Sequence, residues 1–142
     1  MKKATFTLIL TLISLFTLKV FAQTMQDLPD KILGVYWSPK KDAKIEIYIN
    51  GNHYFGKTIW TAVSRKDTQN PDQRLRKRDL LGINLLTDFS YDDGVYVDGQ
   101  IYDPENGKTY SCKISFSGRN LKVRGYIGIS LLGRTETFER VL

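Results

Sequence analysis

The sequence predicts an all-β protein, an antiparallel up-and-down barrel of about eight strands preceded by a signal peptide. Three observations support this prediction. Short segments in which apolar and polar residues alternate recur along the chain, most are joined by tight turns, and residues 23–142 show no clear helical period. A closed barrel is favoured because closure leaves no exposed sheet edge, and it has room for packed side chains or one small ligand. A β-sandwich is the structural alternative.

The first residues have the pattern of a secretory signal peptide. Lys2 and Lys3 precede an uncharged apolar segment, and Val20-Phe21-Ala22 places small residues at −3 and −1 of a cut before Gln23. The apolar segment is shorter than the roughly 20 residues that a membrane span needs. We therefore expect residues 1–22 to be removed, and residues 23–142 to form one domain in the periplasm or outside the cell, with no membrane span.

Composition excludes several functional classes. The net charge of the 142 residues is +6, but loss of Lys2, Lys3 and Lys19 with the leader lowers it to about +3. The basic run at residues 74–78 is short and contains no aromatic residues for base stacking, so nucleic acid is not an expected partner. One cysteine and one histidine exclude an internal disulfide and multi-cysteine zinc sites. We expect no metal and no cofactor.

Each strand is predicted from its own residues. The clearest is Ala43–Asn50, in which Ala43, Ile45, Ile47 and Ile49 share one face. The strands we expect are Leu33–Ser38, Ala43–Asn50, His53–Val63, Leu80–Phe89, Val95–Tyr102, Tyr110–Ser117, Leu121–Ile127 and Arg134–Val141.

Turns and one helix complete this outline. Asn50-Gly51 is typical of a type I′ hairpin turn. The segment Asp103–Gly107 is also predicted to form a turn. Pro104 fixes its own φ angle, Asp103 can cap the turn, and Asn106-Gly107 provides a residue that adopts the left-handed backbone conformation. Residues 24–33 are a candidate short helix at the entrance to the barrel.

Residues on the first and last strands fit the lipocalin-like form of this barrel. Gly34 and Trp37 lie on the first predicted strand, and Arg134 and Arg140 lie on the last, which is its neighbour in a closed sheet. We expect Trp37 to plug the barrel floor with an arginine stacked on its ring, a contact of about 0.5–2 kcal/mol. The alternative is that Trp37 is an ordinary large core residue. Its role is structural in both cases.

One connection is unusually long and basic. Ser64–Asp79 contains six basic and three acidic residues, and loops of this length are often binding elements. Asn70-Pro71-Asp72 reads as a turn that starts a short helical stretch, with Asn70 or Asp72 as its cap. Such a loop over the barrel mouth would attract an anionic ligand. The alternative is a solvated loop whose arginines pair with nearby carboxylates.

Several motifs, taken in order, resemble the secreted bacterial family catalogued as domain of unknown function 2147. The resemblance covers Leu33 to Val141 and rests on Asn70-Pro71-Asp72, Leu75-Arg76-Lys77-Arg78, Leu80-Leu81-Gly82-Ile83, Ile101 to Cys112, Leu121 to Gly128 and Gly133-Arg134-Thr135. It implies a lipocalin-like barrel outside the cytoplasm, with no established activity. Members often carry two cysteines and a last-strand tryptophan, where this chain has Asn50, Phe55 and Phe138. The resemblance therefore implies no disulfide here.

No arrangement of residues points to catalysis. Gly128–Gly133 is not a nucleophile elbow, because the second glycine comes one place too late. His53 lies beside a predicted turn with no triad around it. Cys112 lies on an apolar strand face, where a thiol is either buried and inert or pairs with another chain. The protein is not expected to be an enzyme.

Polar residues at strand ends and in loops form the candidate site. The expected ligand-binding residues are Arg76, Tyr102, Tyr110, Arg134, Asn70 and Asp72, and the expected structural residues are Trp37, Asp103, Asn106, Gly107 and Arg140. We expect the barrel to bind a small amphipathic or anionic molecule without catalysis. One alternative is an envelope interaction module, with a filled barrel, that engages a protein or an acidic polymer through Ser64–Asp79. The other is an enzyme that uses the tyrosine, aspartate and arginine residues as acid–base groups.

Overall fold

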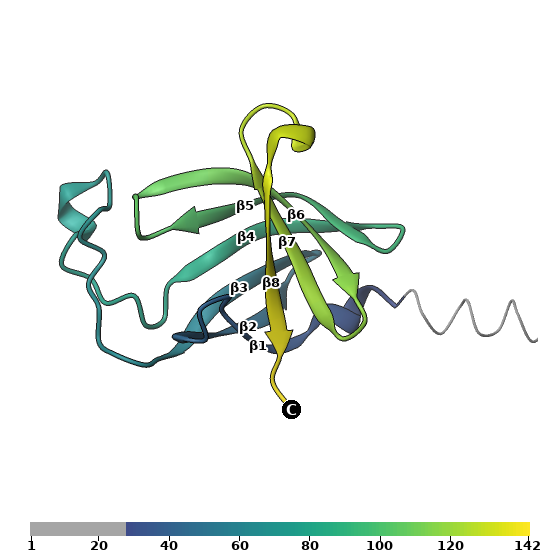
Figure 1. The fold of residues 1–142 in the computed structure, drawn as a ribbon, viewed down its shortest axis with the longest axis horizontal. Helices are drawn as coiled ribbons and strands as arrows, with labels where there is room; N and C mark the ends of the chain where they lie inside the picture. Colours follow the sequence, from purple (N-terminus) through teal and green to yellow (C-terminus); the bar gives the residue numbers. More distant parts are fainter. Residues whose placement is uncertain (1–27) are drawn as a thin grey trace, which may run out of the picture. The chain divides into compact units, whose positions relative to one another are not determined.

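The structure, a computed structural model, describes residues 28–142, and residues 32–142 form one compact unit. This unit is a closed barrel in which each strand pairs antiparallel with the next and β8 returns to β1 (Figure 1). The predicted barrel is confirmed, and its closure excludes the sandwich. The predicted leader lies outside the described residues. The strands are β1 (Gly34–Trp37), β2 (Ala43–Asn50), β3 (His53–Thr61), β4 (Asn84–Asp92), β5 (Val95–Asp103), β6 (Lys108–Ser117), β7 (Asn120–Tyr126) and β8 (Arg134–Arg140).

Two local features differ from the sequence predictions. β4 begins at Asn84 rather than Leu80, because Gly82, at φ +87°, turns the chain there and donates its backbone N–H to the Thr58 carbonyl at 2.7 Å. The connection from β3 to β4 therefore spans residues 62–83, which we call the long loop. At the β2–β3 hairpin, Asn50 pairs with His53, so Gly51 and Asn52 form the turn. Only Gly51 has a positive φ, so the predicted type I′ turn at Asn50-Gly51 is wrong.

The 3-10 helices are short. The predicted helix at residues 24–33 is represented in the described residues by η1 (Pro29–Ile32). The long loop contains η2 (Gln73–Leu75), which is capped as expected: Asp72 Oδ1 accepts the backbone N–H of Arg74 at 3.0 Å. The third, η3 (Ser130–Leu132), lies between β7 and β8.

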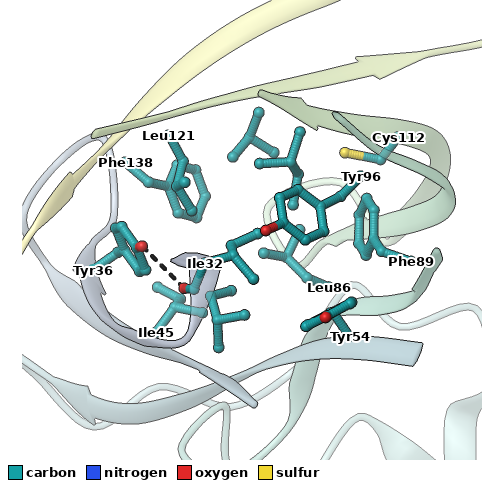
Figure 2. Close-up of a cluster of buried hydrophobic side chains, with 13 residues drawn as sticks. Ile32, Tyr36, Ile45, Tyr54, Leu86, Phe89, Tyr96, Cys112, Leu121 and Phe138 are labelled. Carbon is teal, nitrogen blue, oxygen red and sulfur yellow. Dashed lines mark hydrogen bonds between the residues drawn. The ribbon is translucent and has the colours of Figure 1, made fainter. Parts of the chain in front are cut away.

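One end of the barrel is filled with side chains, as Figure 2 shows. The rings of Tyr54 and Tyr96 meet edge to face, with centroids 5.1 Å apart. The Phe89 ring covers Gly99, where a Cβ atom would lie 2.4 Å from it. The fully buried Ile32 lies among these rings, and its carbonyl accepts the Tyr36 hydroxyl at 3.0 Å. These side chains close the end of the barrel that carries the short β2–β3, β4–β5 and β6–β7 turns.

An arginine joins β8 to β1, but it does not stack on Trp37. The Arg140 guanidinium lies 5.0 Å from the Tyr36 ring centre and donates to the Leu33 carbonyl at 2.8 Å and the Tyr36 hydroxyl at 3.0 Å. Gly34, at φ +139°, makes room for it, because a Cβ there would lie 3.1 Å from the guanidinium.

The prediction that Trp37 plugs the barrel floor is therefore wrong. Neighbouring residues of a strand face opposite sides, and the side chain directed into the barrel is that of Tyr36, which is fully buried. Trp37 is only half-buried and packs edge-on against the exposed Trp60, with centroids 5.6 Å apart. Lys44 Nζ lies over the Trp37 ring at 4.6 Å. Trp37 is thus not an interior core residue either.

Candidate functional site

The opposite end of the barrel is hollow. A cavity of about 890 Å³ lies at the end where the chain makes its β1–β2, β3–β4, β5–β6 and β7–β8 connections. This volume is within the range of small-molecule sites. Apolar side chains from four strands, β2, β5, β7 and β8, contribute to its wall: Ala43, Ile45, Ile101, Val123 and Phe138. The lining also reaches exposed residues such as Val63 and Leu132, so the cavity opens to solvent.

One hydroxyl in the cavity wall lacks a partner among the described residues. Thr58, on β3, is 2% exposed, and its Oγ1 atom makes no hydrogen bond within residues 28–142. Its backbone N–H donates to the Ile83 carbonyl at 3.0 Å, and its carbonyl accepts from Gly82. A buried hydroxyl without a partner costs free energy, and this one is enclosed by its neighbours rather than open to the cavity.

The charges at the mouth are arranged in pairs. Lys40 contacts Glu105 at 2.5 Å, Arg65 lies 3.7 Å from Asp42, and these pairs join the β1–β2 connection to the β5–β6 turn and the long loop. On β8, Arg134 contacts Glu136 at 2.5 Å. The mouth is therefore a ring of alternating charge rather than a cationic collar. The lining residues that carry formal charge are Lys40, Asp42, Arg65, Asp103, Glu105, Arg134 and Glu136.

A buried carboxylate holds the long loop against the barrel. Asp67 is fully buried and accepts hydrogen bonds from the Tyr102 hydroxyl at 2.5 Å, from Asn70 Nδ2 at 2.8 Å and from Arg78 Nε at 2.9 Å. Burial alone would raise the pKa of Asp67, but these hydrogen bonds and the Arg78 charge together lower it. Burial and the neighbouring Asp67 raise the pKa of Tyr102 to about 12. The carboxylate is thus ionised and the phenol neutral across the physiological range.

The predicted loop residues Asn70, Asp72 and Arg76 do not line the cavity. Asn70 is buried, and its Oδ1 atom accepts the backbone N–H of Asp72 at 2.9 Å. Arg76 Nε donates to the Asn70 carbonyl at 2.8 Å. Arg74 pairs with Asp72 at 2.8 Å, and Lys66 pairs with Asp79 at 2.6 Å. These residues fix the shape of the loop. This agrees with the alternative prediction, in which arginines of the loop pair with nearby carboxylates.

Three other predicted residues, Tyr102, Tyr110 and Arg134, line the cavity. The Tyr102 hydroxyl is directed to Asp67, and the Tyr110 hydroxyl accepts from Asn106 Nδ2 at 3.0 Å. Arg134 is highly exposed at the rim. The structure therefore brings half of the predicted ligand-binding residues to one cavity, where two of them have protein partners for their hydroxyl groups.

The predicted turn residues hold the β5–β6 turn and its contact with the long loop (Figure 1). Asp103 Oδ1 accepts the backbone N–H of Glu105 at 2.9 Å, and Asn106 Oδ1 accepts that of Lys108 at 2.8 Å. Gly107 has φ +71°, and a Cβ atom there would collide with the Gln69 carbonyl oxygen. A side chain at position 107 would therefore push the loop away.

The remaining candidates are not part of the cavity. Cys112 is free and fully buried, and burial raises its pKa to about 12, so the folded chain does not present this thiol to a partner chain. His53 lies at the β2–β3 turn, 3.0 Å from Asp88 Oδ1. In the described part of the chain, no three metal-binding side chains cluster together. Residues 28–142 also contain no helix with the length and apolar character of a membrane span.

Sequence reasoning did not identify Thr58 or most of the apolar wall. Alternation placed Ile45 and Val123 on buried strand faces, but it does not tell which buried residues face a hollow and which face a filled interior. That distinction depends on how side chains from all eight strands meet. Thr58 carried no signal, because threonine is common on either face of a strand.

Comparison with known proteins agrees with the fold. A model of the family described as "Uncharacterized protein conserved in bacteria (DUF2147)" matches residues 34–140. Among solved structures, the chain is similar to protein HP1028 from the human pathogen Helicobacter pylori, which is described as belonging to the lipocalin family. The TM-score is 0.70 at 22% sequence identity, and the match covers 78% of this chain and 83% of the other. No curated protein matches the chain.

Proposed function

The chain belongs to the bacterial family named domain of unknown function 2147, and we propose that it binds one small, largely apolar molecule in its barrel. The observation that carries the proposal is the 890 Å³ cavity, whose wall is built mainly from aliphatic and aromatic side chains. Transfer of an apolar molecule from water into such a wall contributes about 25 cal/mol per Å² of buried apolar surface. Barrels of eight strands commonly hold one ligand of this kind.

Within the expected class of amphipathic or anionic molecules, the mouth favours an amphipathic ligand with a neutral polar group. The cationic side chains of the lining each lie against a carboxylate, so an anion would have to displace one. A neutral hydroxyl, carbonyl or ether group at the mouth displaces none of these carboxylates. The cavity also argues against the interaction-module alternative, which assumed a filled barrel.

The proposed role is binding without catalysis. Acid–base catalysis near neutral pH needs a group whose pKa lies close to 7. Tyr102 lines the cavity, but its pKa is raised to about 12, away from that range. Its hydroxyl donates to Asp67 rather than into the cavity. Tyr102 therefore serves as a wall and loop anchor in this proposal.

A cavity-filling substitution tests ligand binding. Ala43→Trp places a large ring in the cavity wall. We expect the unaltered protein to bind the apolar probe N-phenyl-1-naphthylamine with a gain of fluorescence, and this substitution to abolish that gain. Glu46→Trp is the control, because Glu46 lies on the same strand with its side chain half exposed. Equal probe binding by all three proteins would show that the probe binds outside the cavity. No binding by the unaltered protein would contradict the proposal.

Export is the second part of the proposal, and the leader pattern of residues 1–22 supports it. Expression of the whole chain in a bacterial host, followed by cell fractionation and intact mass measurement, tests it. We expect the protein in the periplasm or the medium, with a mass that starts at Gln23. A full-length protein retained in the cytoplasm would contradict export without affecting the binding proposal.

A further inference from the structure

The connection from β7 to β8 exposes a group of aliphatic side chains. We call residues 127–133 the apolar loop, because it contains no charged residue. Its four large side chains are strongly exposed: Ile127 by 73%, Ile129 by 60%, Leu131 by 82% and Leu132 by 78%. Four neighbouring aliphatic side chains left in water are unusual in a soluble domain and mark an interaction surface.

The apolar loop is held in shape rather than left loose. Arg124, on β7, donates from Nε to the Ser130 carbonyl at 2.7 Å and from Nη2 to the Leu131 carbonyl at 3.0 Å. The third guanidinium nitrogen donates to Thr135 Oγ1 at 2.8 Å. Gly133 closes the 3-10 turn through its backbone N–H to the Ser130 carbonyl. Two guanidinium nitrogens of one arginine thus hold the backbone of the loop, while the loop's four large aliphatic side chains remain exposed.

The end of the barrel that carries the apolar loop is also the basic end. The four connections at this end, residues 38–42, 62–83, 104–107 and 127–133, contain eight basic and five acidic residues. The three turns at the other end contain one basic and one acidic residue. Five of the eight cations contact the five carboxylates, and Lys41 pairs with Glu139 of β8. The excess charge therefore belongs to Arg76 and Lys77.

The apolar loop is continuous with the cavity mouth. Ile127 and Leu132 belong to the lining of the cavity, together with Leu80 and Arg65 of the long loop. Exposed aliphatic side chains, a net positive charge and the entrance to an apolar cavity therefore meet at one end of the molecule. An anionic lipid bilayer offers the matching chemistry, with negative headgroups over a hydrocarbon interior.

We propose that this end of the barrel docks on the surface of a bilayer that contains anionic lipids. The apolar loop enters the boundary between headgroups and acyl chains, and Arg76 and Lys77 face the anionic headgroups. Docking itself does not depend on ligand binding. Its consequence does rest on the proposed function: the cavity mouth then faces the bilayer, so an apolar ligand passes between membrane and barrel without crossing water.

A fluorescent label on the loop tests docking locally. The only cysteine, Cys112, is buried, so a cysteine introduced by Leu131→Cys is labelled selectively with an environment-sensitive fluorophore. We expect a blue shift with vesicles of phosphatidylcholine and phosphatidylglycerol in equal parts, and little change with phosphatidylcholine alone. Ile49→Cys is the control, since Ile49 is exposed near the opposite end. No shift at position 131, or equal shifts at both positions, would overturn the proposal.

Charge and side-chain variants of the labelled protein separate the two contributions. Lys77→Glu is expected to weaken binding to the anionic vesicles at least about fivefold, the effect of one lost surface cation. Arg119→Glu, in the β6–β7 turn, is expected to leave binding unchanged. Replacement of Ile127, Ile129 and Leu132 by serine is expected to weaken binding more than tenfold. If Lys77→Glu and the triple serine variant bind vesicles like the parent protein, the surface is not a membrane-docking surface.

Two further measurements separate membrane docking from ligand binding and from self-association. Ala43→Trp in the labelled background is expected to lose the apolar probe and keep the blue shift, so failure of ligand binding leaves docking intact. Native mass spectrometry without lipid is expected to give the same mass for the parent and the triple serine variant, apart from the substituted side chains. A dimer that the serine substitutions dissociate would assign the apolar loop to a second copy of the chain and overturn the proposal.

Discussion

Thr58 carries a hydroxyl that is buried in the wall of an otherwise mainly apolar cavity and has no partner there. Thr58→Val keeps the shape of the side chain and removes this group. Because no protein hydrogen bond is lost, we expect the free energy of unfolding to stay the same within about 0.5 kcal/mol or to rise. Because the hydroxyl is enclosed rather than open to the cavity, we expect the affinities for a medium-chain alcohol and for the alkane of equal length both to stay constant.

Competition with a fluorescent apolar probe measures both affinities, and urea unfolding measures stability. Thr61→Val is the matched control, because Thr61 also lies on β3 and lines the cavity but is less buried than Thr58. Equal losses for alcohol and alkane would indicate a change of cavity shape. A loss of affinity for the alcohol alone would contradict the expectation and show that a ligand reaches the Thr58 hydroxyl.

Among the elements, the seam between β1 and β8 is the shortest pairing of the barrel, with only two residue pairs. Arg140 reinforces it by donating to Leu33 and Tyr36 and by covering the Tyr36 ring. Lysine keeps the charge but not the planar fork or the stacking. We expect Arg140→Lys to lower the free energy of unfolding by about 2 kcal/mol in urea titrations.

Arg134→Lys supplies the comparison for this prediction. Arg134 lies on the same strand, at the open end, with a highly exposed side chain that pairs with Glu136. Exposed ion pairs contribute little to stability, so a change below about 0.5 kcal/mol is expected. Similar losses for both substitutions would mean that Arg140 stabilises only through its charge.

The long loop depends on the buried Asp67. Asp67→Asn removes the buried charge that accepts from Tyr102, Asn70 and Arg78 and is expected to cost about 2 kcal/mol, the range of hydrogen bonds to a charged group. Limited trypsin digestion is expected to cut the loop, rich in arginine and lysine, earlier than in the parent protein. Lys66→Gln is the control, since Lys66 forms an exposed ion pair with Asp79 in the same loop. Unchanged digestion of Asp67→Asn would contradict the role of Asp67 as anchor.

Protonation of the same carboxylate is expected to release the long loop at low pH. The pKa of Asp67 is lower in the folded chain than its ordinary value of 3.8. Its contribution to stability is therefore fully present above pH 3.8 and is lost as the pH falls through the lower folded value. Pepsin digestion at decreasing pH is expected to cut the parent loop only below about pH 4. A loop cleaved as slowly at about pH 2 as at pH 5, relative to an unfolded substrate, would argue against this linkage.

At the scale of the whole molecule, sequence patterns predicted the barrel well and its interior poorly. Alternation over Ala43–Asn50 and turn residues such as Gly107 are local signals. They predicted the order of the strands, the positions of the hairpins and the cap at Asp72, but not the type of the β2–β3 turn or the start of β4. The wrong prediction at the barrel floor, where Tyr36 rather than Trp37 faces inward, has a different origin. One residue of register decides which of two neighbouring aromatic side chains faces inward, and a four-residue strand carries too little alternation to fix it.

The limit of local sequence patterns also explains why half of the predicted ligand-binding residues lie outside the cavity. Asn70, Asp72 and Arg76 were predicted ligand contacts because polar residues in a long loop are often functional. Their partners are other residues of the loop. The cavity instead depends on contacts between strands far apart in the sequence, such as β2, β5 and β7. No local pattern reports whether these strands meet over a filled space or a hollow one.

The two ends of the barrel divide stability and binding between them. Leu121 is fully buried in the filled end, whereas Ile101 is partly buried and lines the cavity. Leu121→Ala leaves a void in a packed core and is expected to lower the free energy of unfolding by about 2–5 kcal/mol. Ile101→Ala enlarges a space that is already open, so we expect a loss of only about 1 kcal/mol.

The preferred ligand size is the second property that distinguishes these two variants. The extra space left by Ile101→Ala is expected to shift the preferred chain length in a series of fatty alcohols upward by one or two carbons, measured by competition with the apolar probe. Leu121→Ala lies outside the cavity lining and is expected to keep the length preference of the parent protein. If both variants lose similar stability and keep the same length preference, the barrel is evenly packed, and its stability and its binding are not separated along the axis.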